Sequence, residues 1–388
     1  MGHRENALPS DEAVTRLRFD FPHLGEREGP LVFEQPSEII VANDVSQVRG
    51  ALARADLAAR AGKWVAGFVC YEAGAAFDAA FRFHGRSDLP LVWFGVFDEP
   101  ISAVAQTQGA APPFDWALST SRPRYDRDIA AILEHIRAGD VYQVNHTVRL
   151  AGRYVGDWHT LYSSLREKQA TGYCACIELG RHRILSVSPE LFFSREDSRV
   201  TFKPMKGTAR RGASETSDRA LRESLATAEK ERAENLMIVD LIRNDLSRIA
   251  EPHSVTVPSL FSVERYPTVW QMTSTVTAEI APEIGLEHIF AATFPCGSIT
   301  GAPKIEAMKI IAELESGPRG IYCGAIGVLR PGGDAVFNVA IRTLAVDTIS
   351  GSGQYGVGGG ITADSLARNE YDEVLAKCLV VQELSAID

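Results

Sequence analysis

The stretch Tyr125-Asp-Arg-Asp-Ile-Ala-Ala-Ile-Leu-Glu-His-Ile-Arg-Ala-Gly139 opens the part of the chain that decides the fold class. Its apolar residues recur at i, i+3, i+4 and i+7, and a glycine follows, so it predicts a helix over 125–138. A strand is expected directly afterwards, over 141–150, and hairpins over 183–203 and 335–361. Helices and strands mix here without regular βαβ repeats, which predicts an α+β fold.

The flanking segments predict further elements in the same mixed pattern. They are a helix over 48–61, strands over 64–71 and 91–97, a long helix over 218–249, extended segments over 255–259, 261–263 and 269–280, a helix over 303–314 and a closing helix over 365–384. Residues 99–124 are rich in Ala, Gln, Ser and Pro without periodicity, which is typical of a connection between two lobes.

Composition and charge exclude several classes of protein. The 388 residues include 40 Lys and Arg against 50 Asp and Glu, a formal net charge of −10, so a basic surface for nucleic acid or anionic membrane is not expected. No apolar run is long enough to span a bilayer, and the first residues lack the apolar core of a signal peptide, so we expect a cytoplasmic protein. The six cysteines are scattered and predict buried, reduced thiols.

Glycine-rich stretches mark two places where a ligand is able to approach the backbone. Gly351-Ser-Gly-Gln-Tyr-Gly356 matches GxGxxG, but it lies in a hairpin and does not open a helix, so a dinucleotide site is not expected. The run Gly358, Gly359 and Gly360 late in a strand indicates either a close ligand or a simple bulge.

A second glycine-containing loop, Gly297-Ser-Ile-Thr-Gly-Ala-Pro-Lys304, precedes a helix. Its spacing does not fit the Walker loop of nucleotide kinases. The sequence leaves two alternatives open, namely a helix N-terminus that binds an anion such as a carboxylate, and an ordinary capped helix.

Acidic residues recur on one face of two expected helices. Glu231 and Glu234 lie three residues apart, and Glu370, Glu373 and Lys377 fall within one arc of the last helix. If the two faces converge on one cleft, they suit Mg²⁺, which prefers oxygen ligands and keeps waters or substrate oxygens in its shell. Each pair taken alone is also typical of a solvated surface.

One lysine lies in an unusual setting for a loop residue. Lys206 is enclosed in Pro204-Met-Lys-Gly-Thr208 at the end of an apolar strand, and Ser188-Pro-Glu190 precedes it in the expected hairpin. A lysine nucleophile needs partial burial to lower its pKa from about 10.4. The alternative is an ordinary solvated lysine.

Taken together, these segments resemble the chorismate-utilising enzymes, from about residue 125 to the C-terminus. The resemblance rests on motifs that occur in order: Gly139-Asp-Val-Tyr-Gln-Val-Asn145, Ser188-Pro-Glu190, Lys206-Gly-Thr208, Ala233-Glu-Asn-Leu-Met-Ile-Val-Asp-Leu-Ile-Arg-Asn-Asp-Leu246, Gly297 to Lys304, Tyr322-Cys-Gly-Ala-Ile-Gly327, Ile341-Arg-Thr343, Gly358-Gly-Gly-Ile-Thr-Ala-Asp-Ser365 and Glu370-Tyr-Asp-Glu373. It implies two lobes of mainly antiparallel sheets packed as a β-sandwich with helices outside. It also implies an N-terminal lobe over 1–115 and a chorismate-binding catalytic domain over 120–388.

A few positions distinguish branches of this family. Lys206 stands where anthranilate synthases have alanine, and Gln143 stands where isochorismate and salicylate synthases have a lysine that activates water. The segment from Tyr266 to Ser274 departs from the histidine that anthranilate synthases usually show near Trp270. The chain is therefore most similar to the aminodeoxychorismate synthases, which make 4-amino-4-deoxychorismate for 4-aminobenzoate and folate. The alternatives are an anthranilate synthase and a non-catalytic binder of aromatic metabolites.

The resemblance also implies a role for each candidate residue. Lys206 would be the covalent nucleophile and Glu190 the general acid, while Glu234 and Glu373 would hold Mg²⁺ with Glu231 and Glu370 acting directly or through water. Substrate contacts are implied for Arg342, Tyr322, Lys377, Lys304, Thr300, Gly358, Gly359 and Gly360. No GxCxG nucleophile motif occurs in the sequence, so we expect a separate glutamine amidotransferase subunit to supply ammonia.

Overall fold

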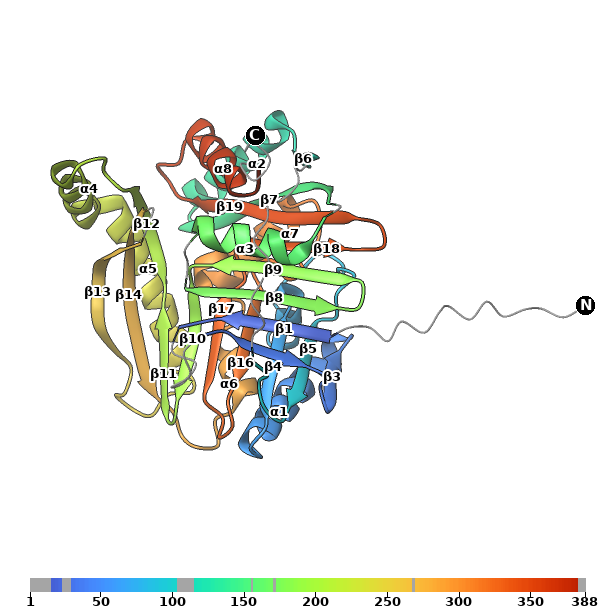
Figure 1. The fold of residues 1–388 in the computed structure, drawn as a ribbon. Helices are drawn as coiled ribbons and strands as arrows, with labels where there is room; N and C mark the ends of the chain where they lie inside the picture. The colour runs from blue at the N-terminus through green and yellow to red at the C-terminus, as the bar shows by residue number, and fades with distance from the viewer. Residues whose placement is uncertain are drawn as a thin grey trace, which may run out of the picture.

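The computed structural model describes residues 15–22, 29–102, 115–154, 156–169, 172–266 and 269–382, which form two large antiparallel sheets (Figure 1). The first sheet runs in the order β15 (Gly301–Ala302), β7 (Gln143–Arg153), β19 (Ser352–Ile361), β18 (Thr343–Asp347), β9 (His182–Ser188), β8 (Tyr173–Leu179), β1 (Thr15–Asp20) and β2 (Leu31–Glu34), with β6 (Asp115–Leu118) also on β7. The second sheet runs in the order β12 (Met205–Arg210), β14 (Val269–Glu279), β11 (Arg199–Lys203), β10 (Leu191–Glu196), β17 (Ala335–Val339), β16 (Ala325–Leu329), β4 (Trp64–Val69), β5 (Val92–Phe97) and β3 (Glu38–Ala42), with β13 (Thr256–Arg265) also on β14.

Helices lie against the outer faces of both sheets (Figure 1). They are α1 (Val45–Arg60), η1 (Tyr71–Ala76), α2 (Arg122–Ala138), α3 (Trp158–Gln169), α4 (Glu215–Thr227), α5 (Glu229–Leu246), α6 (Leu286–Thr293), η2 (Gly297–Ile299), α7 (Lys304–Leu314) and α8 (Ala367–Gln382). Near the first sheet lie α2, α3, α7 and α8, whereas α1, α5 and α6 lie near the second.

Alternating side chains of the central strands fill the cores on the two faces of the second sheet. In β4, Val65 and Val69 face the core beneath α1 and α6, while Ala66 and Phe68 face the core between the sheets. Because both faces are buried, this strand reads as a nearly continuous apolar run. The layers run helix, sheet, sheet, helix, which confirms the expected α+β fold.

Two of the crossovers between the sheets are adjacent, one at Pro189-Glu190 between β9 and β10, the other at 340–342 between β17 and β18. Hydrogen bonds join them: the Val339 N–H donates to the Glu190 carbonyl at 3.0 Å and the Val187 N–H to that of Arg342 at 3.1 Å. The prediction that 183–193 forms one arm of a hairpin and 335–346 one strand is therefore wrong, because each segment is divided between two sheets.

The expected long helix over 218–249 is two helices separated at Ala228, whose ψ of 108° is extended. No Gly or Pro marks the break. Only Leu225 of α4 is buried, whereas α5 turns a stripe ending at Leu246 into the core. The two helices bury different surfaces, because α4 covers β12 to β14 while α5 also reaches α6 and η2.

The N-terminal strands contribute to both sheets. In the first sheet β1 pairs with β8, and in the second sheet β4 pairs with β16. The connection that separates the expected lobes includes residues 103–114, which lie outside the described residues, as do 383–384 of the closing helix. The division into lobes over 1–115 and 120–388 stays a prediction.

Candidate active site

A cavity of about 640 Å³ opens beside the two crossovers. Its lining brings together most of the candidate residues: Glu190, Lys206, Glu231, Glu234, Tyr322, Arg342, Gly358, Gly359, Gly360, Glu370, Glu373 and Lys377. They come from β12, α5, β19, α8, both crossovers and, for Tyr322, the segment before β16, so elements far apart in the chain converge on one site.

Glu190 lies buried at the first crossover, with an exposed fraction of 3%. Burial raises its pKa to about 7, and a hydrogen bond with Ser298 and the charge of Lys206 oppose that rise only in part. Its Oε1 atom has no hydrogen-bond partner among the described residues. The geometry thus provides a carboxylic acid that retains its proton close to neutral pH and faces a lysine.

The glycine run of β19 presents backbone groups to the cavity. In the pairing of β19 with β7, Gly358 lies opposite Thr147 and Gly360 lies opposite Asn145. The N–H groups of Thr147 and Asn145 point to the other edge of β7, where they donate to Glu315 and to the Thr300 carbonyl. Such pairs do not bond to each other, so the N–H groups of Gly358 and Gly360 point away from β7. Lys377 accordingly donates to the Gly358 carbonyl at 2.7 Å.

Two side chains approach the backbone of Gly360 closely. A Cβ added there would lie 2.2 Å from the Gln143 amide nitrogen and 3.1 Å from the Lys206 Nζ. The pairing of β19 with β7 is continuous from Ser352 to Ile361, so the run is not a bulge. The glycines instead make room for a lysine and an amide.

The acidic faces of α5 and α8 do converge on this cavity. Burial raises the pKa of Glu234; nearby Glu231 and Glu370 add to the rise, and Lys206 opposes it. A Cβ on Gly359 would lie 3.6 Å from Glu370 Oε2 and 3.7 Å from Glu373 Oε1. Glu370 is 7% exposed, whereas the Glu373 side chain is 54% exposed. The shared cavity favours a common site, and the assignment of these glutamates to it stays a prediction.

These carboxylates provide oxygen donors without forming a closed cage. Lys377 pairs with Glu373 at 2.7 Å, and Ser365 donates to Glu370 at 2.7 Å. Within the described ranges, no three His, Cys, Asp or Glu side chains are arranged to hold a metal ion alone. The donor set fits a hard cation that keeps waters or substrate oxygens in its shell, as Mg²⁺ does.

Arg342 and Tyr322 also line the cavity. Arg342 lies at the second crossover in the left-handed region, with φ of 49°, and donates to Gln169 Oε1 at 2.6 Å. Burial lowers the pKa of its guanidinium. Tyr322 packs its ring on Gly356, where an added Cβ would lie 2.2 Å from the ring. The planar cation of Arg342 suits a carboxylate ligand.

Comparison with known proteins identifies the family of the chain. The family model of chorismate binding enzymes matches residues 23–383. The chain belongs to this family. It is 39% identical over 287 residues to aminodeoxychorismate synthase component 1 of Klebsiella aerogenes, covering 74% of this chain and 62% of that protein. It is also 39% identical over 261 residues to anthranilate synthase component 1 of Haloferax volcanii, covering 66% of this chain and 49% of that protein.

The fold of the family extends over nearly the whole chain. The crystal structure of anthranilate synthase component I from Streptococcus pneumoniae TIGR4 matches with a TM-score of 0.77 at 25% identity, covering 98% of this chain and 95% of that one. Against the two curated relatives, the chain spans about half to two thirds of their length. The family membership expected from the motifs is thus confirmed.

Two residues that were expected to contact the substrate, Thr300 and Lys304, do not line the cavity. The Thr300 N–H donates to the Gly297 carbonyl at 3.3 Å, and Lys304 Nζ pairs with Asp245 at 2.6 Å and bonds the Thr293 carbonyl. Lys304 therefore joins α7 to α5. The structure favours an ordinary start for α7, and we withdraw the substrate contacts expected for these two residues.

Other lining residues were missed by the sequence analysis: Asn145, Gln169, Arg210, Lys230, Tyr266, Gln271, Ser298 and Ile299. Asn145 and Ser298 belong to motifs quoted above, but a motif does not tell which way each side chain points. Pro267 and Thr268, within the segment that differs from anthranilate synthases, lie outside the described residues.

Two general expectations have direct counterparts in the structure. All six cysteines are buried, as predicted. In the part of the chain that the structure describes, no helix combines the length and apolarity that crossing a bilayer requires.

Proposed function

We propose that this protein is an aminodeoxychorismate synthase component that converts chorismate and ammonia into 4-amino-4-deoxychorismate. The observation that carries the proposal is Lys206, which lines the cavity with its Nζ beside Gly360 and faces the acid Glu190. The similarity to the Klebsiella aerogenes protein of that name supports it.

The proposed reaction consists of two displacements on the ring. Lys206, as the free amine, attacks ring carbon 2, the double bonds shift, and the hydroxyl on ring carbon 4 leaves as water with the proton of Glu190. Ammonia then attacks ring carbon 4, and the bond from ring carbon 2 to Lys206 breaks. The new ammonium returns one proton to the Glu190 carboxylate, so both side chains recover their starting states.

Glu231, Glu234, Glu370 and Glu373 are proposed to hold Mg²⁺ together with substrate oxygens. The donor chemistry and the convergence of α5 and α8 support this assignment. When bound, the ion would neutralise the ring carboxylate of the substrate and polarise the ring.

The second carboxylate of chorismate is proposed to bind at the opposite wall. Arg342 offers a planar guanidinium, Tyr322 lines the same cavity, and the N–H groups of Gly358 and Gly360 point away from β7 toward it. Lys377 is held by Glu373 and the Gly358 carbonyl, so we assign it to the support of these groups.

Ammonia is proposed to come from a partner glutamine amidotransferase. The purified chain should accept ammonium salts but not glutamine.

The test of the proposed function is to incubate the purified chain with chorismate, Mg²⁺ and ammonium and to identify the product by mass spectrometry and chromatography. A product aminated at ring carbon 4 supports the proposal. Anthranilate would overturn it in favour of an anthranilate synthase, and saturable binding without turnover would indicate a binder.

A further inference from the structure

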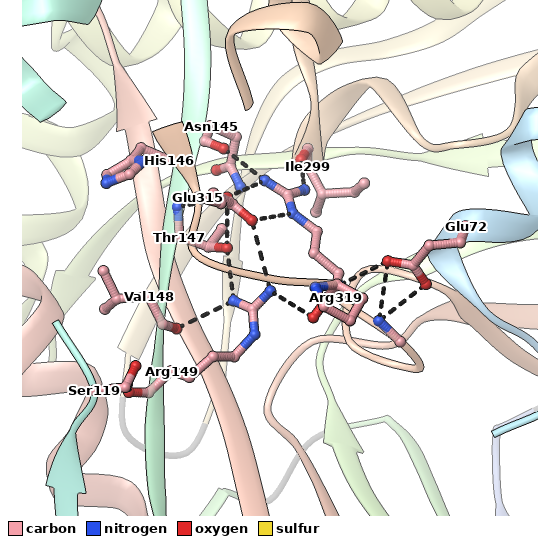
Figure 2. Close-up of polar contacts among 12 residues, drawn as sticks. Glu72, Ser119, Asn145, His146, Thr147, Val148, Arg149, Ile299, Glu315 and Arg319 are labelled. Carbon is pink, nitrogen blue, oxygen red and sulfur yellow. Dashed lines mark hydrogen bonds and ion pairs between the residues drawn. The ribbon is translucent and has the colours of Figure 1, made fainter. Parts of the chain in front are cut away.

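A buried polar network lies behind the cavity wall and contributes no side chain to its lining. It consists of Glu72, Arg149, Glu315 and Arg319 with the backbone groups that they bind (Figure 2). The Glu315 and Arg319 side chains are 2% and 1% exposed and pair at 2.7 Å. Burial would raise the pKa of Glu315, but Arg319 outweighs it and lowers that pKa to about 2. The pair is therefore ionised inside the protein.

The network first fixes the free edge of β7. The short strand β15 pairs only with Gln143 and Val144 of β7. Farther along the same edge, Arg319 Nη2 donates to the Asn145 carbonyl at 2.8 Å. The Thr147 N–H and hydroxyl both donate to Glu315 Oε1, at 2.9 and 2.7 Å. Two side chains thus take the place of a neighbouring strand.

This edge lies directly behind the glycine run. Asn145 is opposite Gly360 and Thr147 is opposite Gly358 in the pairing of β7 with β19. These are the two glycines whose N–H groups face the cavity. Any displacement of β7 at Asn145 or Thr147 therefore moves the backbone donors of the site.

The same arginine also holds a second wall. Arg319 Nη1 donates to the Ile299 carbonyl at 2.7 Å, at the end of η2, where Ser298 and Ile299 line the cavity. Figure 2 shows the guanidinium reaching Ile299 and Asn145 together. One planar side chain with five N–H donors thus bridges two separate parts of the lining.

Glu72 holds a third part of the site in place, namely the segment that leads to Tyr322. Its carboxylate accepts from the N–H of Arg319 at 2.7 Å and from that of Gly320 at 3.0 Å. Arg149 lies between Glu315, at 3.5 Å, and the ring of Tyr322, whose centroid is 5.4 Å from the guanidinium carbon. Buried ion pairs contribute little net stability, but they specify one geometry in some proteins.

We propose that Arg319 is a positioning residue for substrate binding, which sets the distance between the Gly358 and Gly360 donors, η2 and Tyr322. Glu315 and Glu72 hold Arg319 and its loop in place. The inference rests on the proposed function, because the positioned groups are those assigned to the substrate carboxylate. It extends that function to residues that never touch chorismate.

The test is Arg319→Lys, which keeps the charge but loses the fork that reaches both carbonyls. We expect the KM for chorismate to rise about 10-fold with little change in kcat, because ground-state positioning is lost. The matched control is Arg195→Lys. Arg195 is another buried arginine, paired with Asp56 at 3.5 Å and absent from the cavity lining. The control should lower the melting temperature and leave KM unchanged.

Assays are run well below the melting temperature of each variant. If Arg319→Lys lowers the melting temperature like the control and leaves KM at the wild-type value, the network is only structural and the proposal is overturned. If Arg319→Lys fails to fold, Glu72→Gln tests the proposal instead, because glutamine keeps an acceptor oxygen. A raised KM for chorismate in Glu72→Gln supports the proposal, and an unchanged KM overturns it. Failure of the proposed function is seen separately, as a wild type that does not turn over chorismate.

Discussion

Glu190 is the residue whose chemistry depends most directly on pH. Since burial raises its pKa to about 7, it is protonated on the acidic side of neutrality and loses the proton above it. We expect kcat to fall as pH rises through about 7, and Glu190→Gln to remove this limb with a loss of about 100-fold or more. Measuring kcat from pH 5.5 to 9 for the wild type and for Glu190→Gln checks both predictions. An unchanged alkaline limb in the variant would assign it to another group.

The same shift predicts a stability effect. The folded protein binds the proton of Glu190 more tightly than the unfolded chain, where the pKa is 4.5, so stability is full below that value and falls as pH rises through about 7. The loss amounts to roughly 3 kcal/mol at most. Glu190→Gln should therefore gain stability relative to the wild type between pH 5 and pH 8, as measured by urea unfolding. Equal differences at both pH values would contradict this.

Lys206 is proposed to carry the covalent step, and its replacement separates the branches of the family. Lys206→Ala should abolish formation of the product aminated at ring carbon 4, since the first displacement needs the amine. Wild-type protein incubated with chorismate and Mg²⁺ without ammonia should show an adduct on the peptide containing Lys206. The control is Lys203→Ala, because Lys203 pairs with Glu264 and does not line the cavity. Wild-type turnover by Lys206→Ala would refute the assignment.

At this scale the sequence indicates which residues carry chemistry but not where each side chain points. Glu190, Lys206 and the four glutamates line the cavity as expected from their motifs. Lys304 belongs to an equally clear motif, yet its Nζ turns away to Asp245. That direction depends on the packing of α7 against α5, which no local pattern encodes.

Among the elements, α5 and α8 matter because each presents two carboxylates to one space. Glu234→Gln and Glu373→Gln should each raise the Mg²⁺ concentration needed for half activity, since each removes an anionic oxygen donor. Glu229→Gln is the matched control, on an exposed position of α5 outside the lining. Titrations of activity with Mg²⁺ decide. A requirement unchanged in both variants would favour the alternative that these glutamates belong to solvated helix surfaces.

Periodicity predicts the existence of most elements but not which sheet they join. The helix before Gly139 and the strands within 64–97 appear close to their expected limits. The segments around Pro189 and Ile341 look like continuous strands, because apolar residues continue through them. Their change of sheet follows from pairing with distant strands, and the break at Ala228 likewise follows from two different packing surfaces.

For the whole molecule, the N-terminal residues are part of both sheets. We expect the full chain to unfold in one cooperative transition, and a fragment of residues 120–388 to lack a stable fold, because β8 and β16 would lose their partners β1 and β4. Calorimetry of the full chain and circular dichroism of the fragment test this. A folded fragment that binds chorismate would show instead that the two expected lobes are independent. The expected boundary between the lobes was predicted from composition, which carries no information about strand pairing.

Pairing between distant parts of the chain also affects how the protein reaches its native state. Leu17 pairs with Ile177 and Val65 with Leu329, so both sheets contain contacts between residues far apart in the sequence. Contacts so distant along the chain cost closure entropy and slow folding. During refolding from urea, the helical signal should therefore return early and the capacity to turn over chorismate late. Catalytic competence is then a sensitive reporter of the last folding steps.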